Sequence, residues 1–314
     1  YWGNRDDQLR IPANGSIALT LGAFETRTSA EWIRGLGQDE LNINGQAASA
    51  SAVRRASAVL DVIRELAGFE DRARIASANS FPSDAGLASS SSAFAALAVA
   101  GAAAAGLSLD DATLSRIARR GSGSACRSIP GGYVEWLPGT GDRDSFAVRL
   151  AGPDHWDLTD LVVLVDPSPK AVGSSEGHAT AASSPLQGAR LADAPRRIRE
   201  CRQAVLQRDF QRLADVVELD SNLMHAVMAT SWPPLLYLQQ TTIAVLQEAA
   251  GWRRAGIPVC YTVDAGPNPH LLTLSDRADE VAARARAIPG VRKILSSPPG
   301  DAPRVLKAEA PRTG

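Results

Sequence analysis

The chain has 314 residues, 45% of them hydrophobic, and its 33 Lys and Arg against 34 Asp and Glu give a formal net charge of −1. This near-neutral charge argues against nucleic-acid binding, which needs a basic face, and we expect no membrane span because no apolar run approaches about 20 residues. The length fits one large domain or two of ordinary size, with a core that needs no metal or disulfide support.

The first half of the chain predicts alternating strands and helices. Residues 8–34 are typical of extended segments around a turn at Pro12 to Gly15, and Leu41 to Gly45 is typical of a hairpin with an Asn-Gly turn. Residues 81–86 are expected to form a loop. The spacing of apolar residues and the Ser or Asp residues at helix starts predict helices over 51–66, 89–105 and 110–119. The same spacing predicts strands over 74–79, 133–137 and 145–150.

The second half predicts a different order of elements. A Ser, Gly and Pro-rich stretch, 167–188, is expected to be mobile. Around it we expect strands over 161–165, 259–263, 270–274 and 291–295, and helices over 194–208, 210–228, 235–255 and 277–287. Without two of those helices the order is β-α-β-β-α-β, the split βαβ plan. We place the lobe boundary so that residues 1–154 form the N-terminal lobe and 155–314 the C-terminal lobe.

Cysteine and histidine usage favours neither a disulfide framework nor a metal centre. Cys126, Cys201 and Cys260 are far apart and odd in number, which fits a reducing cytoplasm. The four His show no metal-ligand spacing and are expected to be structural. The first 169 residues contain no Lys, which excludes a P-loop there.

The first segment with chemical potential is the loop Pro82 to Ala88, which leads into a helix that begins with Ser89, Ser90, Ser91 and Ser92. A helix start offers unpaired N–H groups and a partial positive charge, and small residues let a phosphate approach the backbone. The hydroxyls suit phosphate oxygens or Mg²⁺. A simple Ser-capped helix remains the alternative.

The second segment runs from Arg119 to Ser128, and Gly131-Gly132-Tyr133 follows. Arg127 can hold a carboxylate through two parallel hydrogen bonds, and Ser122 and Ser124 can add donors. No nucleophile elbow is present in this pattern. A surface loop with solvated Arg is the alternative.

The third segment is Thr262-Val-Asp264-Ala-Gly-Pro-Asn268, where an Asp closes a buried strand and opens onto a Gly-Pro turn. A carboxylate in that place can act on a substrate hydroxyl at a cleft. The alternative is an Asp that caps its own turn.

Together these segments resemble the mevalonate diphosphate decarboxylase family of the GHMP kinase superfamily. Tyr1-Trp-Gly-Asn4-Arg-Asp is similar to that family's Tyr-Trp-Gly-Lys-Arg-Asp, and Phe81 to Ser90 is similar to its Phe-Pro-Thr-Ala-Ala-Gly-Leu-Ala-Ser-Ser. The family's Arg-Gly-Ser-Gly-Ser-Ala-Cys-Arg-Ser recurs unchanged at Arg120 to Ser128, and its Asp-Ala-Gly-Pro-Asn recurs at Asp264 to Asn268. The resemblance covers almost the whole chain.

The resemblance implies a two-lobed α+β fold, with an N-terminal lobe of the ribosomal S5 domain 2 type, a ferredoxin-like C-terminal lobe and an active site between them. It implies ATP-dependent decarboxylation of a phosphorylated mevalonate, a small molecule, with Mg²⁺. A cytoplasmic homodimer without nucleic-acid or membrane partners is expected. The resemblance assigns catalysis to Asp264 and Arg127, substrate contacts to Tyr1, Asn4, Ser122, Ser124 and Ser174, nucleotide contacts to Asn79, Pro82, Gly86, Leu87, Ala88, Ser89 and Ser90, and the metal to Ser89 and Ser90.

Two positions depart from the family pattern. Asn4 replaces a Lys, and loss of that cation weakens the grip on a diphosphate. We therefore expect 5-phosphomevalonate as substrate and isopentenyl phosphate as product, with 5-diphosphomevalonate as the alternative. Asp84 stands where the family has a small neutral residue, and it either points away from phosphate or meets Mg²⁺.

Two other functions compete with decarboxylation. A kinase of the same superfamily would phosphorylate the substrate and stop, and Arg127 together with Asp264 argues against it. A catalytically inactive homologue that senses a metabolite or binds a partner is disfavoured by the intact motifs. Release of ADP without CO₂ would favour the kinase.

Overall fold

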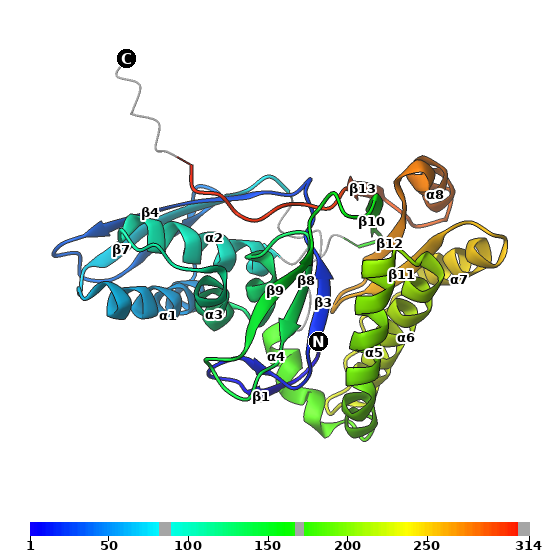
Figure 1. Cartoon of the computed structure of the whole chain (residues 1–314), viewed down its shortest axis with the longest axis horizontal. Coiled ribbons are helices and arrows are strands. Elements are labelled where there is room, and N and C mark those ends of the chain that lie inside the picture. The colour runs from blue at the N-terminus through cyan, green and yellow to red at the C-terminus, as the bar shows by residue number, and fades with distance from the viewer. Residues whose placement is uncertain (82–88, 167–172, 307–314) are drawn as a thin grey trace, which may run out of the picture.

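The chain folds into two lobes with a small sheet between them, as the computed structural model shows for residues 1–81, 89–166 and 173–306 (Figure 1). The N-terminal lobe contains β1 (Asn4–Asp6), β2 (Ile11–Pro12), β3 (Ser16–Leu19), β4 (Thr26–Ile33), β5 (Glu40–Ile43), β6 (Gln46–Ala47), α1 (Ala50–Ala67), β7 (Arg72–Asn79), α2 (Ser89–Ala104), α3 (Asp111–Gly121), the 3-10 helix η1 (Gly123–Ser128), β8 (Tyr133–Leu137) and β9 (Phe146–Ala151). These bounds agree with the predicted elements to within a few residues.

Three sheets build the N-terminal lobe. The strand orders are β4-β7-β5-β6, β3-β8-β9 and the two-stranded β1-β2. The predicted Asn-Gly hairpin joins β5 to β6, and Asn44 and Gly45 both have positive φ, at 52° and 81°. Helices α1, α2 and α3 pack together over the first sheet, and their buried side chains form the core of this lobe.

The C-terminal lobe contains β10 (Leu158–Leu164), α4 (Ser174–Thr180), the 3-10 helix η2 (Ala181–Ser183), α5 (Gln187–Gln207), α6 (Phe210–Thr230), α7 (Gln240–Arg254), β11 (Val259–Val263), β12 (Pro269–Leu274), the 3-10 helix η3 (Ser275–Arg277), α8 (Ala278–Arg286) and β13 (Lys293–Ser297). Its antiparallel sheet has the order β11-β12-β10-β13. The predicted split βαβ plan is confirmed. One face of the sheet packs on α7 and α8, and this contact forms the core of the lobe.

The stretch over 167–188, which we expected to be mobile, contains regular structure in the part that the structure describes. Residues 174–183 form α4 and η2, and α5 begins at Gln187. The reason is a contact distant in sequence, because a Cβ on Gly177 would lie 2.6 Å from the Trp2 ring and the Gly3 N–H donates to His178 Nδ1 at 2.9 Å. Residues 167–172 lie outside the described part of the chain.

Contacts between the lobes fix the place of the cleft. Leu21, Phe24 and Phe81 of the first lobe cluster with Val162, Leu164 and Leu295 of the second. The segment after β13 crosses back over the first lobe (Figure 1), where the Gly300 N–H donates to the Thr20 carbonyl at 2.7 Å. Within the described residues, no helix is long and apolar enough to cross a membrane.

A buried ion pair supports the core of the N-terminal lobe. Asp39 and Arg64, whose side chains are 3% and 4% exposed, form a two-pronged pair with N–O distances of 3.0 and 3.1 Å. Burial by itself raises the pKa of Asp39, but hydrogen bonds from Arg64, Ser57 and the Ala73 N–H outweigh it, so the pKa lies below its ordinary value. The charged carboxylate therefore stabilises the fold above the unfolded pKa of about 4, and this contribution is lost as the pH falls through the folded pKa.

We expect Asp39→Asn to lower the free energy of unfolding at pH 7 by about 3 kcal/mol, because Arg64 stays buried with only the exposed Asp61 as its charged partner. Urea unfolding at pH 7 and at acidic pH measures this loss, which should shrink at acidic pH. The control is Glu25→Gln, since Glu25 pairs with Arg27 at the surface. Equal losses of unfolding free energy in the two variants would contradict a stabilising role of the buried Asp39–Arg64 pair.

Candidate active site

A cleft of about 1730 Å³ lies between the lobes. Its walls include Tyr1, Ser124 and Arg127 from the N-terminal lobe and Asp220 and Asp264 from the C-terminal lobe. The two residues predicted to be catalytic thus face one cavity, although 137 positions separate them.

Asp264 follows the last residue of β11 and lines this cleft. The residue before it, Val263, is hydrogen-bonded to helix α6 through both of its backbone groups. The Val263 N–H donates to Ser221 Oγ and the Val263 carbonyl accepts from His225 Nε2, each at 3.0 Å. Burial lowers the pKa of His225, so the ring is neutral and Nε2 carries the proton. Asp264 therefore stands on a fixed backbone.

Arg127 lies in η1 and lines the cleft from the N-terminal lobe, as Asp264 does from the C-terminal lobe. Its Nη1 donates to Ser16 Oγ at 2.6 Å, and its guanidinium lies 5.7 Å from the centre of the Tyr1 ring. Its Nε is buried and has no hydrogen-bond partner among the described residues. The head group keeps a donor for an anionic ligand.

Tyr1 is held between the lobes. Its ring stacks on His178 at 4.4 Å between centroids and meets Trp136 edge-on at 4.7 Å. Burial raises the pKa of the Tyr1 hydroxyl to about 12, so this group stays a hydrogen-bond donor.

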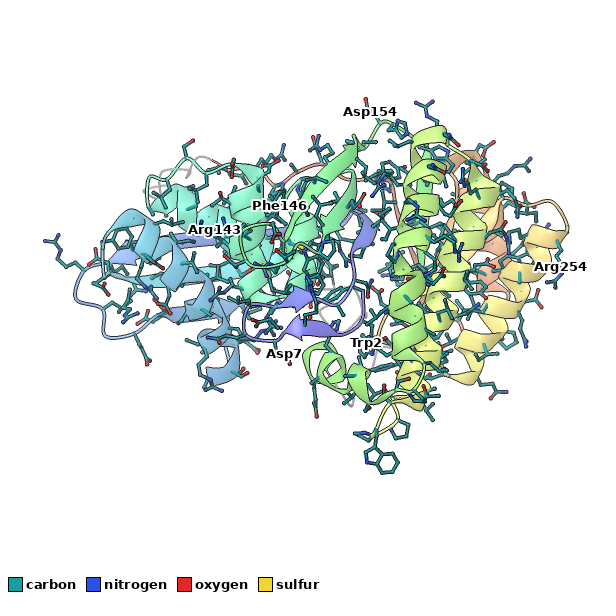
Figure 2. The ribbon with its side chains drawn as sticks, turned by 60° about the horizontal axis from the view of Figure 1, so that its bottom comes forward. Trp2, Asp7, Arg143, Phe146, Asp154 and Arg254 are labelled. Carbon is teal, nitrogen blue, oxygen red and sulfur yellow. The ribbon has the colours of Figure 1, made fainter. Side chains whose placement is uncertain are left out.

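Positive charge gathers around the Tyr1–His178 stack. Burial lowers the pKa of His178 to about 3, and the nearby cations Arg10, Arg127 and Arg190 contribute to this shift. Figure 2 shows that Trp2 lies beside the helices of the C-terminal lobe. Arg190 and Gln187 of α5 donate hydrogen bonds to the Trp2 carbonyl. Of these three Arg residues, Arg127 is the one that lines the cleft.

Gly123 makes room for Tyr1. A Cβ at this position would lie 2.1 Å from the Tyr1 hydroxyl oxygen. We expect Gly123→Ala to displace the ring and to raise the KM for the phosphorylated substrate about tenfold, a loss of about 1.4 kcal/mol of binding. The control is Gly141→Ala, where a Cβ meets nothing within 4 Å. Steady-state kinetics with both variants checks this, and an unchanged KM in Gly123→Ala would contradict it.

Serine hydroxyls join the start of α2 to the η1 segment. Ser90 Oγ lies 3.3 Å from Ser122 Oγ, and Ser91 Oγ forms a short hydrogen bond with Ser124 Oγ. The helix assigned to the nucleotide and the loop assigned to the substrate are therefore directly connected. Ser124 lines the cleft, whereas Ser122 is buried behind it.

The N-terminal half of the cleft carries a row of neutral polar groups. Thr26 Oγ1 donates to Asn79 Oδ1 at 2.8 Å, and Thr28 Oγ1 lies 2.9 Å from Ser77 Oγ. Ser77, Ala78 and both Thr residues line the cavity. Such groups suit the base and ribose of a nucleotide, and the hydroxyls at the start of α2 suit its phosphates.

Several predicted site residues lie elsewhere. Pro82, Gly86, Leu87 and Ala88, like Asp84, fall outside the described residues, and Ser174 begins α4 without a described side chain. Asn4 is not among the residues that line the cleft, and its Nδ2 donates to Asp7 Oδ1 at 2.8 Å. Ser89, the other predicted metal residue besides Ser90, accepts a hydrogen bond from Ser92 through its carbonyl.

The sequence reasoning missed several polar groups of the cleft. Ser16 and Asp220 are the clearest, since Ser16 accepts from Arg127 and Asp220 pairs with Arg197 at 2.8 Å. Asp220 lies within α6 in the sequence Asp-Ser-Asn, which indicates no role by itself. Ser16 lies in a short strand without any motif, so no local signal could have found it.

Three comparisons with known proteins agree with this geometry. A family model for the diphosphomevalonate decarboxylase-like N-terminal domain matches residues 1–147, and one for the mevalonate 5-diphosphate decarboxylase C-terminal domain matches residues 160–305. The diphosphomevalonate decarboxylase of Candida albicans is 37% identical over 285 residues, covering 85% of this chain and 79% of the relative. The human diphosphomevalonate decarboxylase is 36% identical over 306 residues, covering 90% and 76%.

Solved structures match over nearly the whole chain. Mevalonate diphosphate decarboxylase from Staphylococcus aureus has a TM-score of 0.91 at 36% identity, covering 96% of this chain and 92% of that one. A second structure, described as a complex with MVAPP, AMPPCP and magnesium, has a TM-score of 0.89 at 31% identity, covering 96% and 93%.

The two-lobed α+β fold with its cleft defines a protein of the GHMP kinase type, as expected from the motifs. Both halves of the chain match models of one family, and relatives above 30% identity cover most of its length. The chain belongs to the diphosphomevalonate decarboxylase family, and it is an enzyme of the carboxy-lyase class. The predicted family resemblance is confirmed.

Proposed function

We propose that this enzyme uses ATP and Mg²⁺ to convert (R)-5-diphosphomevalonate to isopentenyl diphosphate, ADP, phosphate and CO₂. The observation that carries the proposal is that Asp264 and Arg127, one from each lobe, line the same cleft. The family match supports it, because the relatives are named for the diphosphate and one solved relative holds MVAPP, AMPPCP and magnesium.

Asp264 and Arg127 have different roles in the proposed reaction. Asp264 accepts the proton of the tertiary hydroxyl as that oxygen bonds to the γ-phosphorus and ADP leaves. Arg127 holds the carboxylate through charge-assisted hydrogen bonds. The C–O bond then breaks to release phosphate, and the electrons of the breaking C–C bond form the double bond as CO₂ departs.

The other candidates hold the two ligands in place. Tyr1 and Ser124 contact the substrate, with Ser174 as a further candidate. Asn79 and the Pro82, Gly86, Leu87 and Ala88 loop would contact the nucleotide, and Ser89 and Ser90 would hold its phosphates and Mg²⁺. Neutral hydroxyls and backbone N–H groups fit this task, since phosphoryl transfer depends mainly on positioning and electrostatics.

The diphosphate is better supported than the monophosphate that Asn4 suggested. That argument depended on one lost cation, whereas the relatives are named for the diphosphate and one solved relative holds MVAPP. Arg10 and Arg190 lie near the Tyr1–His178 stack but are not among the residues that line the cleft. A cytoplasmic homodimer stays a prediction, and free Cys126, Cys201 and Cys260 are compatible with a reducing compartment.

The test measures ATP-dependent CO₂ release from 5-diphosphomevalonate and 5-phosphomevalonate side by side. A clear preference for the diphosphate supports the proposal. A preference for the monophosphate would return the substrate to the one that Asn4 suggested, and ADP release without CO₂ would show a kinase. Asn4→Lys in the same assay measures how much that position contributes.

A further inference from the structure

A buried acid–base pair lies on the cleft face of the C-terminal sheet, apart from the residues used above. His270 Nδ1 and Asp160 Oδ2 are 2.8 Å apart, and their side chains are 14% and 6% exposed. Both line the cleft. Asp160 Oδ1 is buried and has no hydrogen-bond partner among the described residues.

The strand register places His270 close to Asp264. His270 on β12 is paired with Thr262 on β11, and Asp264 follows Thr262 by two residues, so all three point to one face. At about 3.4 Å per residue and about 4.8 Å between strands, the two Cα atoms are about 8 Å apart. A tetrahedral phosphoryl group bridges such a gap between side chains.

The sheet face that carries His270 also packs against the residue that precedes the loop assigned to phosphate. Val162 on β10 is paired with His270 and lies on the same face. Phe81, the last described residue before that loop, packs against Val162. His270 thus lies between the point where the loop leaves the core and the carboxylate that acts on the substrate.

Two of the other cations that line the cleft are engaged elsewhere, because Arg197 pairs with Asp193 and Asp220, and Arg27 pairs with Glu25 at the surface. Arg304 also lines the cleft, from the exposed segment after β13. Arg127 belongs to the substrate carboxylate. The nucleotide half contains no Lys among its described lining residues, yet a transferring phosphoryl group needs a positively charged donor.

We propose that His270, oriented by Asp160, is a protonated donor to the γ-phosphoryl group through Nε2 as this group moves to the substrate and leaves as phosphate. Asp160 takes the Nδ1–H, so the ring orientation is fixed and its charge is balanced. His270 is then a catalytic residue and Asp160 a positioning residue. The inference rests on the proposed ATP-dependent reaction.

The charged groups around His270 allow this role. Asp160 faces it from β10, Asp264 from the end of β11, and Asp166 lies beyond the end of β10. On the helices that border the cleft, Asp220 and Arg197 neutralise each other. Carboxylates therefore lie near the ring from two strands of the sheet, and Arg127 and Arg304 line the same cleft.

The first experiment needs no turnover. The chain has four His, so imidazole ¹⁵N spectra resolve each ring. With magnesium present, AMPPCP should shift the His270 Nε2 resonance, and ADP should leave it nearly unchanged, because only AMPPCP carries a γ-phosphoryl group. Equal responses to the two nucleotides would overturn the proposal, whether or not the enzyme decarboxylates 5-diphosphomevalonate.

The second experiment separates catalysis from folding. We expect His270→Gln to lower kcat by about 10²-fold, the usual cost of one preorganised donor, while the affinity for 5-diphosphomevalonate stays within about twofold. Asp160→Asn should lower kcat less and move the alkaline limb of the pH profile, which His270→Gln should abolish. The control is His155→Gln, since His155 bonds the Val205 carbonyl at 3.0 Å and does not line the cleft.

The outcomes are distinguishable. An active wild-type enzyme with an unchanged kcat and pH profile in His270→Gln would overturn the role of His270 alone. A wild-type enzyme that forms no ADP with either phosphorylated mevalonate would overturn the proposed function. Loss of folding in His270→Gln leaves the nucleotide comparison by NMR as the deciding result.

Discussion

Asp264→Asn should lower kcat about 10²–10⁴-fold, the range that general acid–base catalysis contributes. The amide keeps the size of the side chain but cannot accept the proton of the substrate hydroxyl. Since α6 fixes Val263 through Ser221 and His225, the substitution should leave the backbone in place. Substrate and ATP affinities, measured by direct binding, should therefore stay within a few-fold.

The matched control is Asp276→Asn, which changes an exposed Asp in η3 outside the cleft. Rapid-quench measurement of ADP formation assigns the affected step, because the proton is lost during phosphoryl transfer. If Asp264→Asn formed ADP at the normal rate and failed only to release CO₂, the proposed role of Asp264 would be wrong.

Arg127→Lys should lower kcat/KM for 5-diphosphomevalonate about 10²–10³-fold, the usual effect of losing a preorganised donor. Lys keeps the charge but loses the planar fork that matches a carboxylate, so the exchange is not conservative here. The KM for ATP should change much less, because Arg127 lies on the substrate side, against Ser16 and Tyr1.

The ratio of ADP formed to CO₂ released gives a second measure of Arg127. Poor alignment of the carboxylate should raise this ratio above one in the variant. The control is Arg149→Lys, since Arg149 pairs with Asp301 at the surface and does not line the cleft. A ratio of one with a raised KM for ATP would argue against a carboxylate contact.

These predictions and the inference on His270 concern three parts of one reaction. In the proposed reaction Asp264 acts on the hydroxyl, Arg127 on the carboxylate and His270 on the phosphoryl group. Asp264 follows β11, Arg127 lies in η1 and His270 lies in β12, and all three line a single cleft. The proposal thus gives each group whose charge changes during the reaction a contact of its own.

The sequence by itself determined most of the local structure and the class of chemistry. Helical period and Asp or Ser start signals predicted α1, α2 and α3, and the Asn44-Gly45 turn predicted the β5–β6 hairpin, because these features depend on neighbours along the chain. The Arg120 to Ser128 and Asp264 to Asn268 motifs indicated the family, which the comparisons confirm.

Only the tertiary structure decided which side chains meet. Gly177 and His178 are helical because they pack on Trp2 and Gly3, about 175 residues earlier, and local composition contains no trace of that contact. Asn4 drew attention through its motif, yet its amide bonds Asp7. Asp160 and His270 are ordinary strand residues until strand register pairs their side chains on the cleft face. Periodicity states which face a residue occupies, whereas the partner on that face depends on how distant strands pair and how the lobes pack.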